Sequence, residues 1–268
     1  MSDPIDTDAP PPRPASPSGP GGHFTAWIWD TIKTWGPALL AVLLIRSVLA
    51  EPFRIPSGSM VPSLEIGDHI LVTKFSYGLR IPLTRIPVGD LSLPDRGDVV
   101  VFVKPGTDNT FLSHTFDLPV PPFATLDYVK RVVGLPGDSI EVRDNQLYIN
   151  GDAQAREYVD KHSFVNEHCR PSPTREFKED LGGREHAILT TDSYPMRMAD
   201  YGPEEVPPGK VFVMGDNRDH SSDSRVWGYV PLRNIKGRAR FVWLSYDQCK
   251  PGVPLFGEFR GDRFGAGL

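Results

Sequence analysis

The chain has 268 residues, enough for one large domain or two modest ones. Its formal net charge is −5, so it lacks the basic character of nucleic-acid-binding proteins, and we expect no nucleic acid among its partners. Its 28 prolines are about twice the usual share. Because proline ends helices and favours turns and strand edges, a loop-rich, mainly β protein is favoured over a helical bundle.

The N-terminal region divides into a polar tail and one apolar segment. Seven of the first twenty residues are proline, and residues 1–33 are predicted to be a disordered tail that leads up to a membrane. Residues 34–50 are the most apolar stretch, and a helix of that length spans roughly 25 Å. This favours a single transmembrane helix over a buried core helix or a cleaved signal peptide. The positive charges on its two sides balance, so charge leaves the orientation open.

Residues 51–268 are expected to form an antiparallel β domain. Short apolar runs bounded by turn residues predict strands at residues 69–73, 98–103, 127–133, 139–142, 146–149, 210–214 and 238–244. Residues 107–125 are predicted to be an irregular insertion, and residues 152–208 an inserted β-rich subdomain. The two cysteines, Cys169 and Cys249, could pair in an oxidising compartment or remain thiols, and the sequence leaves both possibilities open.

Two serines flank a glycine directly after the apolar segment, in the run Pro56-Ser57-Gly58-Ser59-Met60. A serine becomes a nucleophile when a neighbouring base takes its proton. Gly58 gives the backbone conformational freedom and leaves room for a peptide, so that the Ser59 amide and the Ser57 hydroxyl can form an oxyanion hole. A plain linker is the alternative. Apolar residues that alternate from Met60 onward favour an ordered strand or edge instead.

Lys130 is the candidate base for this serine. In a strand, the adjacent Lys130 and Arg131 point to opposite faces, so one of them must face the apolar side. A lysine removed from water loses its proton more easily, whereas arginine does not. A surface lysine is the ordinary alternative. None of the seven histidines has a recognisable catalytic setting, although His220 lies among polar residues.

A polar loop at residues 214–231 follows a predicted buried strand. It is rich in turn-forming residues, and a loop of this kind between apolar strands is more often functional than a plain connector. A hydroxyl here could orient the lysine amine, and an ion pair between Asp223 and Arg225 could fix the loop.

Three stretches in this order resemble a known family. LLIRSVLAEPFRIPSGSMVPSLEIGD is similar to the membrane exit and nucleophile segment of bacterial type I signal peptidases, DYVKRVVGLPGD to their lysine segment, and GDNRDHSSDSRVWGYVP to their third segment. Together with FSYGLRIP they cover most of residues 43–231 apart from the insertions. Ser63 stands where the family commonly has threonine, and His220 replaces a frequent asparagine.

The resemblance implies a membrane-bound serine endopeptidase that removes signal peptides from exported preproteins after a small-x-small (Ala-x-Ala) motif. It implies a Ser/Lys dyad without metal or cofactor, and exported preproteins and membrane lipid as partners. It also implies a cytoplasmic tail and a catalytic domain on the outer face of the cytoplasmic membrane. The residue roles that it implies are Ser59 as nucleophile, Lys130 as base, Ser57 and Ser59 as the oxyanion hole, Ser221, Asp223 and Arg225 as supporting residues, and Ile55, Met60 and Val129 in the substrate pockets.

Two alternatives stay open at this point. A related dyad peptidase could serve a single exported substrate, such as a pilin, with the same active site. A membrane-anchored β domain that binds a partner and catalyses nothing is the second. We treat His162, His168 and Cys169 as ordinary loop residues and predict no metal site.

Overall fold

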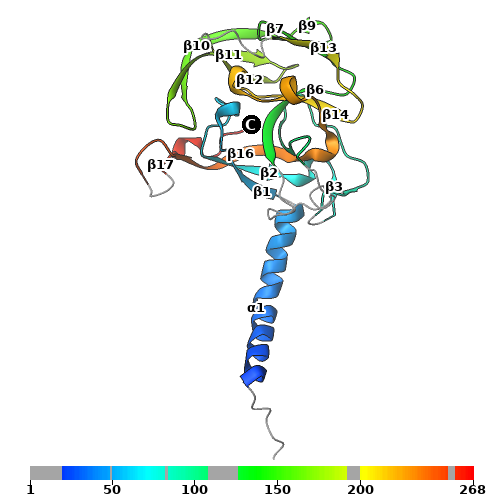
Figure 1. Ribbon diagram of the computed structural model, residues 1–268, viewed down its shortest axis with the longest axis vertical. Helices are drawn as coiled ribbons and strands as arrows, with labels where there is room; N and C mark the ends of the chain where they lie inside the picture. Colours follow the sequence, from blue (N-terminus) through cyan, green and yellow to red (C-terminus); the bar gives the residue numbers. More distant parts are fainter. Residues whose placement is uncertain (1–19, 49, 82–83, 108–125, 192–199, 253–256) are drawn as a thin grey trace, which may run out of the picture. The chain divides into compact units, whose positions relative to one another are not determined.

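A computed structural model describes residues 20–48, 50–81, 84–107, 126–191, 200–252 and 257–268 (Figure 1). The chain divides into two compact units, residues 1–43 and residues 44–268. Most of the predicted tail and of the predicted irregular insertion at 107–125 lies outside the described residues.

The first unit contains most of a long helix, α1, which spans Pro20–Val48. It therefore begins well before the predicted start at Thr34, and Ala50 already belongs to a strand. Proline suits the first position of a helix because its missing N–H would have no partner there. Within the described residues, no helix combines the length and apolar character that a membrane crossing requires.

The second unit is built on an eight-stranded antiparallel sheet (Figure 1). Along the sheet, seven strands follow in the order β1 (Ala50–Arg54), β2 (Asp68–Thr73), β16 (Ile235–Asp247), β5 (Val99–Val103), β6 (Asp127–Gly134), β14 (Lys210–Met214) and β15 (Val230–Pro231). The eighth, β17 (Glu258–Phe259), pairs with β16. All five residues of β5 are buried, as an uninterrupted run of valine and phenylalanine requires of a central strand.

Three smaller antiparallel sheets complete the unit. One is formed by β10 (Arg156–Val165), β11 (Pro171–Asp180) and β12 (Glu185–Thr190), all within the segment 152–208 for which a β-rich insertion was predicted. A second consists of β13 (Tyr201–Glu205), β7 (Ser139–Arg143), β8 (Gln146–Ile149) and β9 (Asp152–Ala153), and the third of β3 (Leu79–Arg80) and β4 (Pro87–Val88). The predicted mainly β, antiparallel fold class is confirmed.

Short helical turns connect the strands. They are η1 (Gly58–Met60), η2 (Lys74–Tyr77), η3 (Arg218–His220), α3 (Ser224–Trp227), η4 (Leu232–Asn234) and η5 (Gly261–Arg263). The prediction of a strand after Ser59 is wrong, because η1 and further turns occupy this stretch. Met60 and Leu64 are nevertheless buried in the core beneath β2 and β5, so the apolar alternation reflects packing rather than strand geometry.

Sheet pairing brings together segments that lie far apart in the sequence. β6 lies between β5 and β14, so the loop after Met214 begins beside the strand that carries Lys130. The turn η1 packs against both β6 and η3. The three sequence segments singled out above therefore converge on one region.

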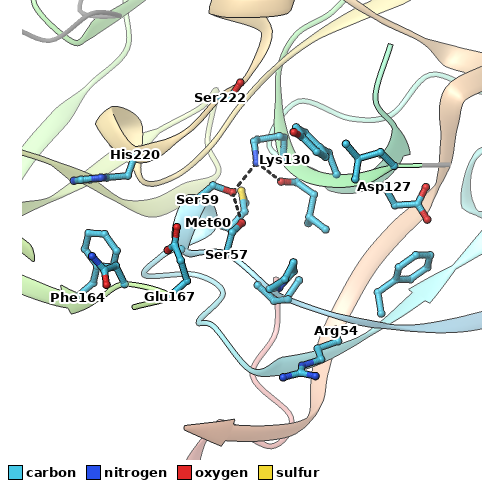
Figure 2. A pocket seen from close by; sticks show the side chains of 18 residues that line it. Arg54, Ser57, Ser59, Met60, Asp127, Lys130, Phe164, Glu167, His220 and Ser222 are labelled. Carbon is cyan, nitrogen blue, oxygen red and sulfur yellow. Dashed lines mark hydrogen bonds between the residues drawn. The ribbon is translucent and has the colours of Figure 1, made fainter. Parts of the chain in front are cut away.

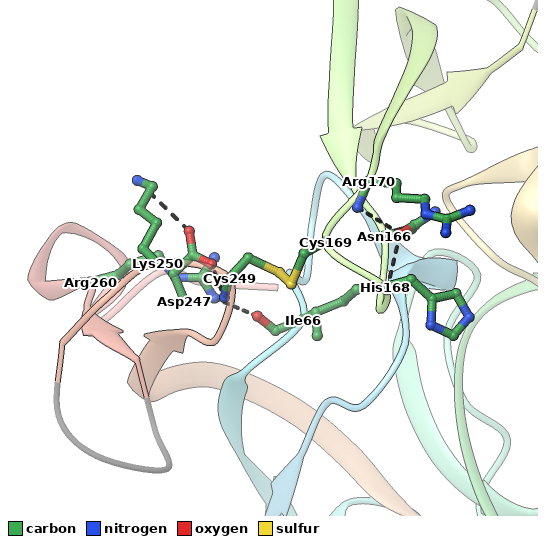
Figure 3. The surroundings of a disulfide bond; sticks show 9 residues. All are labelled: Ile66, Asn166, His168, Cys169, Arg170, Asp247, Cys249, Lys250 and Arg260. Carbon is green, nitrogen blue, oxygen red and sulfur yellow. Dashed lines mark hydrogen bonds and ion pairs between the residues drawn. A yellow bond between two sulfur atoms is a disulfide. The ribbon is translucent and has the colours of Figure 1, made fainter.

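A disulfide joins Cys169 to Cys249, with the two Cα atoms 5.3 Å apart (Figure 3). Of the two possibilities that the sequence left open, the structure has the paired form. Cys169 lies in the turn between β10 and β11, and Cys249 follows β16. The bond therefore ties the tip of the inserted hairpin to the C-terminal part of the main sheet.

This cross-link is expected to stabilise the fold. The two cysteines are separated by 80 residues, and a closed loop of this length restricts the unfolded chain. Replacing both by serine should lower the free energy of unfolding by about 2–4 kcal/mol. Urea denaturation of both proteins under oxidising conditions measures this difference, and reductant should destabilise the wild type but not the double variant. Equal denaturation midpoints would contradict the expectation.

Candidate active site

The proposed nucleophile and base lie in direct contact. Ser59 is on the turn η1, and Lys130 is on the central strand β6. The Lys130 Nζ donates a hydrogen bond to the Ser59 Oγ over 2.7 Å and a second to the Val129 carbonyl over 2.8 Å (Figure 2). The structure thus brings together two residues that are 71 positions apart.

The Lys130 amine is almost fully removed from water, with 3% of the residue exposed. Burial lowers its pKa from 10.5 to about 8. The carboxylates of Asp223 and Asp216 oppose this change, and the positive charge of Arg225 adds to it. A neutral amine is therefore accessible near physiological pH, which a surface lysine does not offer.

The pairing of Asp223 with Arg225 explains how a buried carboxylate is accommodated near this amine. Two hydrogen bonds of 2.9 and 2.8 Å join the guanidinium to the carboxylate, and the Gly215 amide donates a third. Burial opposes ionisation of Asp223, but the Arg225 charge together with the hydrogen bonds from Arg225 and the Gly215 amide outweighs burial and holds the pKa of Asp223 below its usual value. Arg225 thereby offsets the negative charge that would favour protonated Lys130.

Ser221 is buried at 2% exposure, close to this pair. Its hydroxyl makes no hydrogen bond with any residue in the described part of the chain. The predicted contact with the lysine amine is therefore not formed in this structure. A methyl group on Gly215 would lie 2.2 Å from the Ser221 Oγ and 2.5 Å from the Ser59 carbonyl oxygen, so only glycine permits this close approach.

Asn217 attaches the loop after β14 to the nucleophile turn. Its side-chain amide donates to the Gly58 carbonyl over 3.0 Å, and its backbone amide donates to the Ser59 carbonyl over 3.2 Å. Sequence reasoning classed Asn217 only as a turn former. Its position three residues beyond a buried strand could have marked it, but its partner could not be read from the sequence.

Gly58 owes its identity to space rather than to backbone conformation. It is absent from the glycines with a positive φ, so the conformational reason given above is wrong. An added Cβ would come within 2.9 Å of the Phe164 ring. Phe164 belongs to β10, so the inserted hairpin packs directly on the nucleophile turn.

The remaining candidates line one cavity of about 520 Å³ that opens over Ser59. Ile55 and Met60 are buried, and Val129 is partly buried beside them in the same apolar cluster. Ser57 is exposed, and its Oγ lies 3.5 Å from the Ser59 Oγ. His220 also lines this cavity. Its Nε2 lies 3.4 Å from the Ser172 Oγ, and it makes no hydrogen bond to Ser59.

Arg131, the neighbour of Lys130, is also buried. The alternation of side chains along a strand led us to expect only one of these two residues on the apolar side. It makes two hydrogen bonds, of 2.8 and 2.7 Å, to the Asp216 carboxylate. His186 Nε2 lies 3.9 Å from Asp216 and 3.4 Å from Glu179, and Glu179 pairs with Arg218. A buried chain of ionisable side chains therefore connects the lysine strand to the inserted sheet.

Among the described residues, no cluster of three or more histidine, cysteine, aspartate or glutamate side chains could hold a metal ion. Of the three residues His162, His168 and Cys169, which we treated as ordinary loop residues, Cys169 forms the disulfide.

The Glu179–Arg218 pair should contribute strongly to stability. Burial opposes ionisation of Glu179, yet Arg218 and His186 outweigh it and lower its pKa to about 2. A group with a lowered pKa stabilises the fold at neutral pH and loses this effect as the pH falls from 4.5 towards 2. Glu179→Gln leaves the Arg218 charge buried and unpaired, so the free energy of unfolding should fall by about 3–5 kcal/mol.

Urea denaturation at neutral pH measures this loss. Glu157→Gln is the matched control on the exposed part of β10, and it should change stability by less than about 0.5 kcal/mol. Equal losses in the two variants would show that the buried pair has no special role.

The comparisons with known proteins point to one family. A family model described as "Signal peptidase, peptidase S26" matches residues 28–244. Signal peptidase I of Pseudomonas fluorescens is 41% identical over 229 residues, which cover 81% of this chain and 73% of that protein. Signal peptidase I of Pseudomonas aeruginosa is 40% identical over 232 residues, with the same two shares.

A solved structure of a signal peptidase I from Enterococcus faecalis V583 is 26% identical, covering 55% of this chain and 97% of that one. Its TM-score of 0.29 is too low to support a comparison of folds. The family predicted from the ordered sequence segments is confirmed by the family model and the Pseudomonas relatives. This chain therefore belongs to the signal peptidase family, peptidase S26.

Proposed function

We propose that this chain cleaves signal peptides from exported preproteins with a Ser59–Lys130 dyad. The observation that carries the proposal is the 2.7 Å hydrogen bond between the Lys130 Nζ and the Ser59 Oγ, made by a buried amine whose pKa is about 8. In the reactive state Lys130 is neutral and its lone pair accepts the Ser59 proton as the serine oxygen attacks the scissile carbonyl. Membership of the signal peptidase family supports the choice of substrate.

The negative charge that develops on the carbonyl oxygen needs donors close to Ser59. The Ser57 hydroxyl, 3.5 Å from the Ser59 Oγ, and the Ser59 amide fill this role in the proposed mechanism. Collapse of the tetrahedral intermediate breaks the peptide bond, and Lys130 returns its proton to the leaving amine. A water molecule, activated by the Lys130 amine, then hydrolyses the acyl-enzyme and releases the signal peptide.

The substrate is expected to bind as an extended strand between β1 and β6. Residues 53–56 and 126–129 of these two segments line the cavity. Ile55, Met60 and Val129 form shallow apolar surfaces beside Ser59, which suit small side chains at the first and third positions before the cut. We expect these side chains to leave room for small residues only, which would give the small-x-small preference.

We further propose that α1 anchors the enzyme in the cytoplasmic membrane as a single-pass protein, with the tail inside and the catalytic domain on the outer face. Two properties of the helix support this. Its C-terminal half falls in the most apolar stretch of the sequence, and Trp27, Trp29, Trp35, Leu39 and Leu40 are exposed. Such an anchor would hold the active site where exported chains emerge.

The dyad can be tested by two substitutions. Ser59→Ala should reduce kcat/KM for a preprotein at least about a thousandfold, and Lys130→Met at least about a hundredfold. Lys130→Met should not destabilise the fold at pH 7, because it removes an amine whose protonation is disfavoured by burial. Assays of purified protein with sequencing of the new N-terminus measure the activities, and denaturation checks the fold. Retained cleavage by the Lys130 variant would exclude the dyad.

The pH dependence provides a separate test. Below its pKa of about 8, Lys130 is protonated and cannot accept the serine proton, so kcat/KM should fall about tenfold per pH unit on the acid side. A pH–rate profile of wild-type enzyme, over a range in which denaturation shows it folded, measures this slope. A rate that stays constant to pH 5 would rule out Lys130 as the base.

A further inference from the structure

The cavity continues past Ser59 onto the inserted hairpin. On one side of the nucleophile it is lined by β1 and β6, and on the other by Phe164, Asn166 and Glu167 at the end of β10 and by His220 and Ser222 of the third segment. Figure 2 shows Arg54 and Asp127 on the first side, and Phe164, Glu167 and His220 on the second. These five residues form a second wall of the cavity, and none of them has a role in the proposed mechanism.

An extended substrate must pass this wall. If the residues before the cut lie between β1 and β6, the chain crosses Ser59 and the residues after the cut leave towards the hairpin. We propose that Glu167 determines specificity for these residues, favouring a basic side chain and disfavouring an acidic one within the first three positions after the cut. This inference rests on the proposed function.

The charge on Glu167 is available for such a contact. Its side chain is exposed, and it makes no hydrogen bond or ion pair with any residue in the described part of the chain. The other carboxylate that lines the cavity, Asp127, lies on the opposite side of Ser59 and pairs with Lys236 over 2.9 Å. Glu167 is thus the acidic group that a substrate would meet after the cut.

The wall is held in place from two directions. The Phe164 ring packs edge-on against His220, with the ring centres 5.1 Å apart, and it also covers Gly58. The Asn166 side-chain oxygen accepts hydrogen bonds of 3.0 Å from the amides of His168 and Arg170, which close the turn (Figure 3). The disulfide at Cys169, two residues from Glu167, ties this turn to Cys249. Because the turn is already fixed, its backbone does not have to become ordered when Glu167 contacts a charged side chain of the substrate.

The test uses peptides that share the sequence up to the cut and carry lysine, glutamate or serine at each of the first three positions after it. The full-length wild type, Glu167→Gln and Glu167→Lys are compared with Glu157→Gln, which removes the same charge from β10 outside the cavity. Measurements at about pH 8.5, where histidine is ordinarily neutral, limit any contribution from His220.

At one or more of these positions the wild type should prefer lysine over glutamate in kcat/KM by about two- to tenfold, as expected for exposed charges. The preference should disappear in Glu167→Gln, reverse in Glu167→Lys and persist in Glu157→Gln. It should also weaken at about 1 M salt, because screening then acts within about 3 Å.

Two contrary outcomes can be told apart. If the wild type cleaves all the peptides but neither Glu167 variant changes the lysine-to-glutamate ratio, the assignment of Glu167 is wrong and the proposed function stands. If the folded wild type cleaves none of them, including the serine peptides, the proposed function fails and this inference fails with it.

Discussion

The burial of the Lys130 amine is the constraint on which the site depends. An amine at the centre of a sheet must either be paired with a carboxylate or exist in its neutral form. Here its nearest partners are the Ser59 hydroxyl and a backbone carbonyl, neither of which carries a charge. The nearby carboxylates have their own cations: Asp223 binds Arg225, and Asp216 binds Arg131. These pairs reduce the pull of both carboxylates on a lysine proton, so that the amine can lose its proton near its lowered pKa of about 8.

That arrangement requires three distant segments to be held together. The antiparallel pairing of β6 with β14 places the loop after Met214 beside the lysine strand. Asn217 then donates hydrogen bonds to the carbonyls of Gly58 and Ser59, and Gly215 gives the space for this approach. From the other side, Phe164 of the inserted hairpin packs on Gly58. The insertion thus forms a sheet of its own and also contributes to the wall of the site.

The strands and the candidate residues that the structure brings together were largely predictable, whereas the contacts that support them were not. Uninterrupted valine runs predicted the central strands, and serine and lysine stood out by chemistry and by their resemblance to a family. The stretch after Ser59 was mistaken for a strand because Met60 and Leu64 are buried, and local alternation cannot separate a strand from packed turns. The roles of Arg131, Asn217 and Phe164 depend on partners 85, 159 and 106 residues away, and the cysteine pairing on one 80 residues away. A single sequence does not reveal such tertiary distances.

In the proposed mechanism, Ser59 carries the acyl group during turnover. The most direct measurement is mass spectrometry of the enzyme quenched in acid while it processes a signal-peptide ester, followed by peptide mapping. We expect a mass increase equal to the acyl part of the substrate, located on the fragment that contains Ser59, and we expect this increase to be absent in Ser59→Ala. An adduct on another side chain, or an unchanged adduct in Ser59→Ala, would contradict it.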